Sequence, residues 1–300
     1  MKLSQLKYFQ EACKYNSISI AAENNFISQP SFSSAITKLE KELDVTLLNR
    51  NSRGVTPTEA GSAILDKINE IFFTIEEINA IAYAHSIRGN VHLATIPCLF
   101  DNILPLVLKK TNAEKLDLKV SVHCAESHEI YHQVLSGLAS FGIVFDSDEI
   151  QSPEIIFTPL FEDEYVLYVG PQSPYWNADS ITIQEAFEQP YIAYRDEFIK
   201  NNGGVSDIFK GMTPNIALRT DDLESIKKMI HEDNYVAFYH RFMTHDDIYV
   251  KYGLVRPLTI SNYDVRTRVG YIESSKYKTT NVDRLFIEML KAVVTDTLGQ

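Results

Sequence analysis

Apolar residues at the start of the chain recur every three or four positions, which is the spacing of helices that bury one face. Two short segments before residue 27 show this pattern. Their apolar positions are Leu3, Leu6, Phe9, Ala12, Cys13, Ala21, Ala22 and Phe26. A third helix is predicted to begin at Ser28, a good N-cap, with Pro30 in the first turn, where its missing N–H costs nothing.

The third predicted helix has an apolar stripe and an opposite polar face. The stripe consists of Phe32, Ile36, Leu39 and Leu43. The polar face is almost uncharged and consists of Gln29, Ser31, Ser33, Ser34, Thr37 and Lys38. Residues 45–48 then favour a strand, and the turn at 50–54 carries Arg50 and Arg53. Helices followed by such a hairpin are typical of a winged helix-turn-helix.

Residues 58–88 predict one long helix, which Thr58 caps and Gly89 and Asn90 end. Its apolar residues step by four and three, as in a heptad repeat, and are Ile64, Ile68, Ile71, Ile75, Ile78 and Ala82. At about 1.5 Å per residue the helix is about 45 Å long. Because that is too long and one-sided to pack only on a small domain, we expect a dimerising coiled coil.

From residue 91 onward, strand-like and helix-like segments alternate. The predicted strands are 91–96, 118–123, 142–145, 165–169, 191–194, 235–239 and 266–272. The predicted helices are 104–110, 127–138, 183–187, 223–232 and 283–297. This order indicates two α/β lobes with parallel sheets, and the last two segments return the chain to the first lobe. Pockets in such folds lie beyond the carboxyl ends of the strands.

Composition places the chain among ordinary folded proteins. It has 300 residues, of which 45% are hydrophobic and 23% charged, enough for two or three domains. No stretch approaches the roughly 18 apolar residues of a membrane helix, and the first thirty residues lack a secretory leader pattern. Three cysteines without a CxxC pair fit a reducing compartment. We expect a cytoplasmic protein with no membrane partner.

The net charge of −12 is unevenly distributed. Residues 1–65 hold seven of the 28 basic side chains and six of the 40 acidic ones, so they are close to neutral. The acidic excess therefore lies in the rest of the chain. Since DNA binding depends on neutralising phosphates, only the N-terminal segment is expected to contact DNA.

These residues also carry a family resemblance that covers the whole chain. The N-terminal signals are Met1–Phe9, Ser17–Ala22, Ser28–Ser33, Ile36, Lys38–Glu40, Glu42–Leu43, Leu47–Leu48, Arg50 and Thr58–Gly61. Looser signals follow at Leu104–Pro105, Ser127, Leu135, Gly137 and Pro159–Glu164. The chain resembles the LysR-type transcriptional regulators.

The resemblance implies three parts. Residues 1–58 would form an α+β winged helix-turn-helix domain, 59–88 a linker helix for dimerisation, and 89–300 a two-lobed α/β, periplasmic-binding-protein-like effector domain. Lobe I would comprise about 89–162 and 266–300, and lobe II about 163–265. The resemblance further implies a homotetramer on double-stranded DNA with an inverted-repeat operator, a small-molecule effector, no cofactor and no enzymatic activity.

Two sets of site residues follow from the family match and from position in the fold. The DNA-binding set is Ser28, Gln29, Pro30, Ser31, Ser33, Ser34, Thr37, Lys38, Arg50 and Arg53. The effector-binding set is Pro97, Cys98, Phe100, Ser127, Tyr194, Phe198 and Thr220. Gln29 can read adenine, and helix N-termini favour an anionic effector. Many relatives have Arg and Gln where this chain has Ser34 and Ala35, so base preference does not carry over.

Other interpretations of these residues remain open. The polar helix face can be merely solvated, Arg50 and Arg53 can belong to an ordinary surface loop, and pocket rims resemble core edges in sequence. The run 128–132 matches HExxH, the zinc peptidase motif, but both histidines fall roughly 90° to 130° from the centre of the helix's apolar arc, towards water. Downstream third-ligand candidates are Glu149 and Glu154.

Two further hypotheses concern the cysteines and the space between the lobes. Cys98 and Cys124 both follow predicted strands of lobe I, and they can be either packed cysteines or a redox pair. Peroxide-responsive members of the family place their cysteines in the second lobe, where this chain has none. An architectural DNA-binding protein would be favoured if the two lobes enclosed no cavity. No P-loop, GxSxG or dinucleotide motif supports another chemistry.

Overall fold

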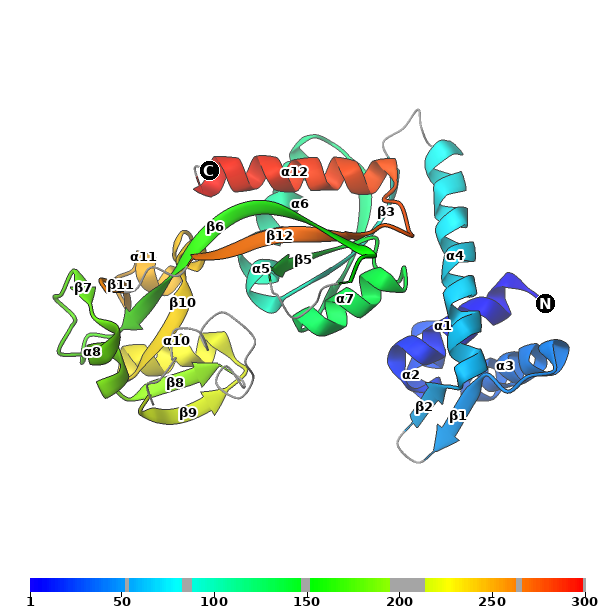
Figure 1. Ribbon diagram of the computed structural model, residues 1–300, viewed down its shortest axis with the longest axis horizontal. Coiled ribbons are helices and arrows are strands. Elements are labelled where there is room, and N and C mark those ends of the chain that lie inside the picture. The colour runs from blue at the N-terminus through cyan, green and yellow to red at the C-terminus, as the bar shows by residue number, and fades with distance from the viewer. Residues whose placement is uncertain (52–53, 83–87, 147–151, 195–213, 263–265, 299–300) are drawn as a thin grey trace.

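The computed structural model describes residues 1–51, 54–82, 88–146, 152–194, 214–262 and 266–298. The N-terminal part contains α1 (Leu3–Tyr15), α2 (Ile18–Asn24), α3 (Gln29–Leu43), β1 (Leu48–Asn51) and β2 (Gly54–Pro57). β1 and β2 pair as an antiparallel hairpin. The three predicted helices and a hairpin wing are therefore confirmed (Figure 1). The predicted bounds of the wing were wrong: its first strand is Leu48–Asn51 and not 45–48, so Arg50 lies in β1, where it pairs with Val55, and not in the turn.

A small apolar core holds the three helices and the wing together. Its fully buried side chains include Phe9, Ala12, Ala21, Phe32, Ile36, Leu39 and Leu47. Phe26 is not part of it, contrary to the prediction from spacing. Its side chain is 95% exposed, because α2 ends at Asn24 and Phe26 lies in the following turn with a φ of 55°.

The long helix α4 (Glu59–Ala82) starts directly against the wing. Thr58 Oγ1 accepts a hydrogen bond from the Gly61 N–H at 2.9 Å. A Cβ on Gly61 would lie 2.1 Å from the Leu47 carbonyl oxygen, so only glycine permits this close approach. The prediction that the helix continues to residue 88 was wrong, since Arg88 begins a strand that also includes Gly89 and Asn90.

The isoleucines along α4 are partly buried against the N-terminal domain and partly exposed. Ile68 is 2% exposed and Ile64 is partly buried, and both pack on the core of the N-terminal domain. Ile71 and Ile78 are 37% and 59% exposed. The prediction that the whole seam serves dimerisation was therefore wrong for its first two residues, because the helix-turn-helix covers them.

Lobe I is a mixed sheet with helices packed on it (Figure 1). Its strands are β3 (Arg88–Thr95), β4 (Asp117–Cys124), β5 (Phe141–Phe145), β12 (Arg266–Ser274) and the first part of β6 (Ile155–Val169). Its helices are α5 (Pro97–Asn102), α6 (Leu104–Ala113), α7 (Ser127–Leu135) and α12 (Asn281–Leu298). β3 pairs in parallel with β4 and β5, whereas β12 pairs antiparallel with β5 and β6. The expected parallel sheet is thus only partly correct.

Lobe II is built around the second part of β6. Its strands are β7 (Ser180–Ile181), β8 (Tyr191–Tyr194), β9 (Ile216–Thr220), β10 (Val236–His240) and β11 (Arg256–Ile260). Its helices are α8 (Ile183–Glu188), α10 (Leu223–Glu232), the 3-10 turn η1 (Arg241–Thr244) and α11 (Ile248–Lys251). β6 pairs with β12 over 155–164 and with β10 and β11 over 165–169, so this single strand connects the two lobes.

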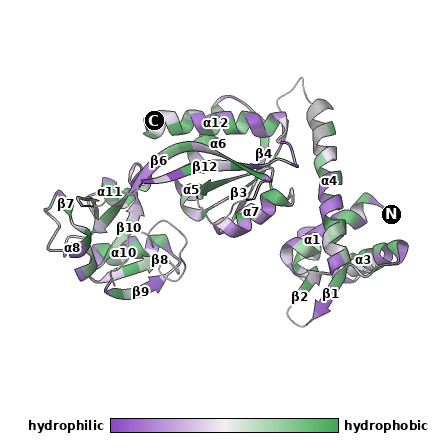
Figure 2. Cartoon of the chain, in the orientation of Figure 1, coloured by the Kyte–Doolittle hydropathy of each residue, from purple (hydrophilic) through white to green (hydrophobic). Residues whose placement is uncertain are grey.

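Hydrophobic residues concentrate along the strands and inner helix faces of both lobes (Figure 2). The helix α4 lies beside lobe I, where the Lys276 Nζ is 3.4 Å from Glu70 Oε1 and the Phe73 ring contacts the Tyr277 ring at 6.1 Å. Among the helices of the described ranges, none combines the length and the apolarity that crossing a bilayer requires.

Candidate nucleic-acid interface and effector site

The N-terminal half of α3 presents the predicted polar face to solvent. The Ser28 side chain caps the helix by accepting from the Ser31 N–H at 3.4 Å. Six of the predicted residues are exposed, namely Ser28, Gln29, Pro30, Ser31, Ser34 and Lys38, and two are half-buried, Ser33 and Thr37. The opposite side of α3 is buried in the core. Short, uncharged side chains on one exposed helix face can enter a DNA major groove closely.

Side-chain contacts attach the wing to this helix. Arg50 Nη1 donates to Ser33 Oγ at 2.8 Å, and its Nη2 lies 3.7 Å from Glu40 Oε2. Glu40 Oε1 accepts from the backbone N–H groups of Leu47 at 2.9 Å and Leu48 at 3.3 Å. The contacts of Glu40 were missed by sequence reasoning, because Glu40 stands beside Lys41 and Glu42 in a charged stretch of α3 that does not single it out. Arg53 lies outside the described residues.

The predicted effector residues fall at the ends of neighbouring strands. Pro97, Cys98 and Phe100 are in α5 after β3, and Ser127 starts α7 after β4. Because β3 and β4 pair in parallel through Thr95 and Cys124, these groups lie at one edge of lobe I. In lobe II, Tyr194 pairs directly with Thr220 at the ends of β8 and β9. Phe198 lies outside the described residues.

The thiols of Cys98 and Cys124 both have raised pKa values. Burial raises the pKa of Cys98 to about 12, and burial also raises the pKa of Cys124. The negative charge of Asp101 acts in the same direction on both thiols. Because the thiolate is the reactive form, these pKa values disfavour a redox role at neutral pH.

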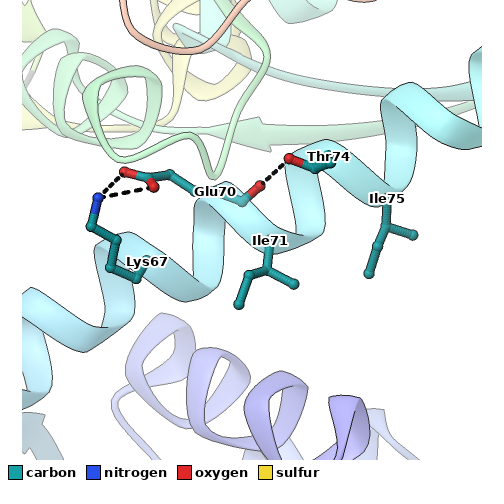
Figure 3. Close-up of a pocket in the computed structure, with 5 residues that line it drawn as sticks. All are labelled: Lys67, Glu70, Ile71, Thr74 and Ile75. Carbon is teal, nitrogen blue, oxygen red and sulfur yellow. Dashed lines mark hydrogen bonds and ion pairs between the residues drawn. The ribbon is translucent and has the colours of Figure 1, made fainter.

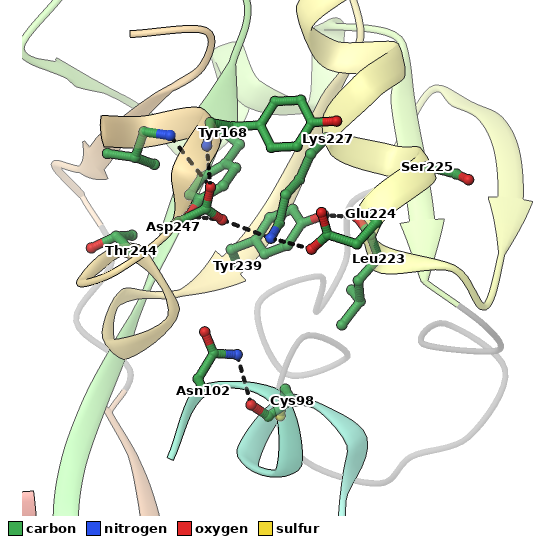
Figure 4. A network of polar contacts seen from close by, with 12 residues as sticks. Cys98, Asn102, Tyr168, Leu223, Glu224, Ser225, Lys227, Tyr239, Thr244 and Asp247 are labelled. Atoms are coloured by element: carbon green, nitrogen blue, oxygen red, sulfur yellow. Dashed lines mark hydrogen bonds and ion pairs between the residues drawn. The ribbon is translucent and has the colours of Figure 1, made fainter. Parts of the chain in front are cut away.

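A buried polar network in lobe II faces α5 (Figure 4). Lys227 Nζ lies 2.7 Å from Asp247 Oδ2 and 2.7 Å from Glu224 Oε1, and the Tyr168 hydroxyl donates to Asp247 at 3.4 Å. Burial lowers the pKa of Lys227, but its two carboxylate partners outweigh burial and hold that pKa above 10.5. The sequence signal that we missed is a lysine between Ile226 and Ile230 on the apolar stripe of α10.

Acidic groups of both lobes meet beside this network. Asp101 of α5 has a raised pKa, first because of burial and then because of the Glu224 charge, while Lys227 opposes the shift. Lys227 is already neutralised by two carboxylates. An anionic effector would therefore meet repulsion at this point, which counts against the expected anionic class here.

His240 lies where the two lobes join. Its ring stacks on Phe145 at a centroid distance of 4.3 Å and contacts Tyr165 at 4.2 Å. His240 Nδ1 is 3.3 Å from Asp163 Oδ2. Burial lowers the pKa of His240, and Asp163 opposes the shift. At neutral pH the imidazole is uncharged in this aromatic site.

The HExxH run lies on α7 but does not form a metal site among the described residues. His128, Glu129 and His132 are exposed, whereas Ile130, Tyr131 and Val134 are buried. His123 Nε2 contacts Glu129 Oε1 at 2.9 Å. Within the described ranges no group of three metal-binding side chains comes together. Glu154 precedes β6, and Glu149 is outside the described residues.

A groove on α4 offers an uncovered apolar surface (Figure 3). It is lined by Lys67, Glu70, Ile71, Thr74 and Ile75. Lys67 and Glu70 form an ion pair at 2.9 Å at one end. Ile78 continues the apolar side one turn further along the helix. The groove therefore combines isoleucines with a charged rim, as helix–helix interfaces do.

The fold and the exposed face of α3 define a class, the winged helix-turn-helix regulators with a two-lobed binding domain. Residues 3–62 match the family model described as "Bacterial regulatory helix-turn-helix protein, lysR family", and residues 84–295 match "LysR substrate binding domain". The chain belongs to the LysR family. It is a DNA-binding transcriptional regulator with an effector-binding domain, and not an enzyme.

Similar proteins support this assignment over nearly the whole length. The HTH-type transcriptional regulator CysL of Bacillus subtilis is 24% identical over 298 residues, covering 96% of both chains. The DNA-binding transcriptional dual regulator OxyR of Escherichia coli is 24% identical over 233 residues, covering 77% of this chain and 76% of OxyR.

Solved structures share the fold. A full-length OxyR variant from Pseudomonas aeruginosa superposes with a TM-score of 0.70 at 17% identity, covering 98% of this chain and 95% of the other. Full-length CbnR complexed with its target DNA gives a TM-score of 0.65 at 18% identity, covering 98% of this chain and 100% of the other.

Proposed function

We propose that the polar face of α3 reads the operator directly, with the wing beside it. The observation that carries this proposal is the array of exposed, short polar side chains on one side of α3. The proposed contacts are Ser28, Gln29, Pro30, Ser31, Ser33, Ser34, Thr37, Lys38, Arg50 and Arg53. Short hydroxyl and amide groups read base edges or phosphates singly, and Lys38 supplies a phosphate contact.

The oligomer is built through α4 in this proposal. The groove around Ile71 and Ile75, extended by the exposed Ile78, accommodates the same helix of a second copy. Two N-terminal domains then read the halves of an inverted repeat about one helical turn apart. Two such dimers form a homotetramer, as the family resemblance implies. The domain boundaries of 1–58, 59–88 and 89–300 are proposed together with this assembly, except that Arg88 belongs to β3 and therefore to the effector domain.

The effector is assigned to the ends of the strands that face the junction of the two lobes. Pro97, Cys98, Phe100 and Ser127 of lobe I and Tyr194, Phe198 and Thr220 of lobe II are the proposed lining. Binding there shifts the population between two arrangements of the lobes, which requires different affinities for the two states. The DNA partner and the free cysteines Cys13, Cys98 and Cys124 support a cytoplasmic location.

The test is binding of the full chain to the intergenic DNA upstream of its own gene. Binding is measured at several salt concentrations in the presence of nonspecific competitor. Specific retention with a salt slope that reflects several phosphate contacts supports the proposal. If only nonspecific binding is found there, a random-sequence library identifies any other operator. A chain that selects no sequence from that library would refute operator recognition by α3.

A further inference from the structure

The hydrogen bond between Arg50 and Ser33 has a fixed direction. A guanidinium can only donate, so Ser33 Oγ is the acceptor of the 2.8 Å bond from Arg50 Nη1. The single hydrogen of the Ser33 hydroxyl is then left for another partner. Because hydrogen bonds in a chain polarise one another, a cationic donor behind the oxygen makes that hydroxyl a stronger donor.

Arg50 is itself held in place by Glu40. The Glu40 carboxylate lies 3.7 Å from Arg50 Nη2 and also accepts from the N–H groups of Leu47 and Leu48. The side chain of Glu40 is 16% exposed and that of Arg50 is 38% exposed. The chain from the wing backbone through Glu40 and Arg50 therefore orients the Ser33 oxygen.

In two neighbouring contacts, side-chain oxygens of the same helix face accept hydrogen bonds from within the protein, as the Ser33 oxygen does. Ser28 Oγ accepts from the Ser31 N–H, and the two hydroxyl oxygens lie 2.8 Å apart, so one of their two hydrogens stays available. The Ser19 hydroxyl donates to Gln29 Oε1 at 3.2 Å, which leaves the Gln29 NH₂ group as the less occupied half of the amide. Hydroxyl and amide hydrogens of this helix face are therefore available to an acceptor outside the protein.

We propose that Ser33 acts as a hydrogen-bond donor in DNA recognition, and that Arg50 is the positioning residue that fixes this role. The proposal rests on the proposed DNA contact by α3. The partner of Ser33 is an acceptor atom: a purine N7, a keto oxygen of guanine or thymine, or a phosphate oxygen. The exocyclic amino groups of cytosine and adenine are donors and cannot accept the Ser33 hydrogen.

The experiment starts from a duplex that the full chain selects from a random library. Single changes are then placed along one half-site. 7-Deazapurines remove N7, thio-substituted thymine and guanine weaken the keto acceptors, and methylphosphonates neutralise phosphates. Base analogues without exocyclic amino groups test the opposite polarity. The dissociation constant is measured for the native chain and for Ser33→Ala.

One acceptor change is expected to weaken binding of the native chain about threefold to tenfold, the range of one hydrogen bond. The same change is expected to have no further effect on Ser33→Ala. Whether it is a base or a phosphate analogue identifies the source of the acceptor. Ser33→Thr, which keeps the hydroxyl, retains the sensitivity, and Arg50→Gln loses it. Ser121→Ala, on the exposed strand β4, behaves as the native chain.

Three results would overturn the proposal. In the first, removal of an exocyclic amino group weakens binding of the native chain but not of Ser33→Ala. In the second, every analogue weakens binding of the native chain and of Ser33→Ala equally. In the third, Arg50→Gln remains as sensitive to the acceptor change as the native chain. A native chain that selects no sequence from the library would instead refute DNA recognition itself at the first step. The two failures are therefore distinguished before any analogue is tested.

Discussion

One carboxylate, that of Glu40, connects the end of α3 to the start of the wing. Its Oε1 accepts two backbone N–H groups, from Leu47 and Leu48, and its Oε2 faces Arg50. Glu40→Ala leaves both donors without this acceptor and is expected to lower the free energy of unfolding by about 2 kcal/mol. Chemical denaturation measures the change. The exposed Glu23→Ala should stay within about 0.5 kcal/mol of the native chain, and equal effects of the two would contradict the role of Glu40.

His240 makes stability depend on pH in a defined direction. Burial among Phe145, Tyr165 and Phe242 lowers its pKa below 6.5, although Asp163 opposes the shift. A histidine with a lowered pKa stays neutral in the folded protein while the unfolded chain takes up a proton. Its contribution is therefore complete above about pH 6.5 and is lost as the pH falls from there towards the folded pKa.

The variant His240→Gln removes this titration and keeps an amide donor near Asp163. The free energy of unfolding, measured from pH 8 to pH 5, should fall less steeply below pH 6.5 in the variant than in the native chain. The comparison uses slopes, so a general loss of stability from the smaller side chain does not affect it. Identical slopes in the two proteins would show that His240 titrates normally.

Lys227 is a buried cation paired with two carboxylates, of which Asp247 is buried and Glu224 is exposed. Asp247, with a side chain that is 1% exposed, loses its charge partner in Lys227→Met. Breaking a buried pair from one side is expected to cost about 3–5 kcal/mol of unfolding free energy, measured by chemical denaturation. The adjacent Lys228→Met provides a matched control, because that side chain is 66% exposed and faces Glu232 at 3.9 Å. A small loss in Lys227→Met would mean that Asp247 finds another partner.

At the scale of elements, the pattern predicts segments that bury one face. α10 has the predicted bounds, 223–232, and α3 begins after the predicted cap Ser28. The missed elements lack such a face. β9 is exposed at its three central residues, and α5 has only six residues and starts with a proline. The first part of β6 was missed because its burial alternates weakly around Pro159 and it is held by long-range pairing with β12.

The exposed half of α4 gives a direct test of dimerisation. In Ile78→Glu, the proposed interface would bury a carboxylate beside its own copy, which costs several kcal/mol. Sedimentation at micromolar concentration should show a shift from dimer-based assemblies to monomer, with the helix content by circular dichroism unchanged. Ser62→Glu introduces the same residue on roughly the opposite side of the helix and should leave the assembly intact. Unchanged sedimentation of Ile78→Glu would place the dimer contact elsewhere.

At the scale of the whole molecule, the sequence predicts the parts but not their contacts. The polar face of α3 follows from helical spacing, and nearly all of its predicted residues do lie on one side. The contact of α4 with lobe I, through Glu70 with Lys276 and Phe73 with Tyr277, joins residues about 200 positions apart. The Lys227 network likewise joins α10 to the start of α11. Contacts of this kind depend on tertiary packing, which local periodicity does not encode.

The charge distribution of the whole chain predicts where salt acts on DNA binding. Residues after 65 carry 21 of the 28 basic groups but 34 of the 40 acidic ones, so the body repels DNA and phosphate contacts are confined to the N-terminal domain. Lys38 is exposed on the polar face of α3. Lys38→Gln should reduce the slope of log affinity against log salt by about 0.9 per phosphate, or about 2 for a dimer.

The same variant should weaken binding to operator and to unrelated DNA by similar factors, because a phosphate contact carries no base information. Lys109→Gln removes an exposed lysine from α6 of lobe I and should leave the slope unchanged. If Lys109→Gln lowered the slope as much as Lys38→Gln, the DNA would contact lobe I as well. In that case the acidic body would have to present a local basic surface strong enough to overcome its net charge.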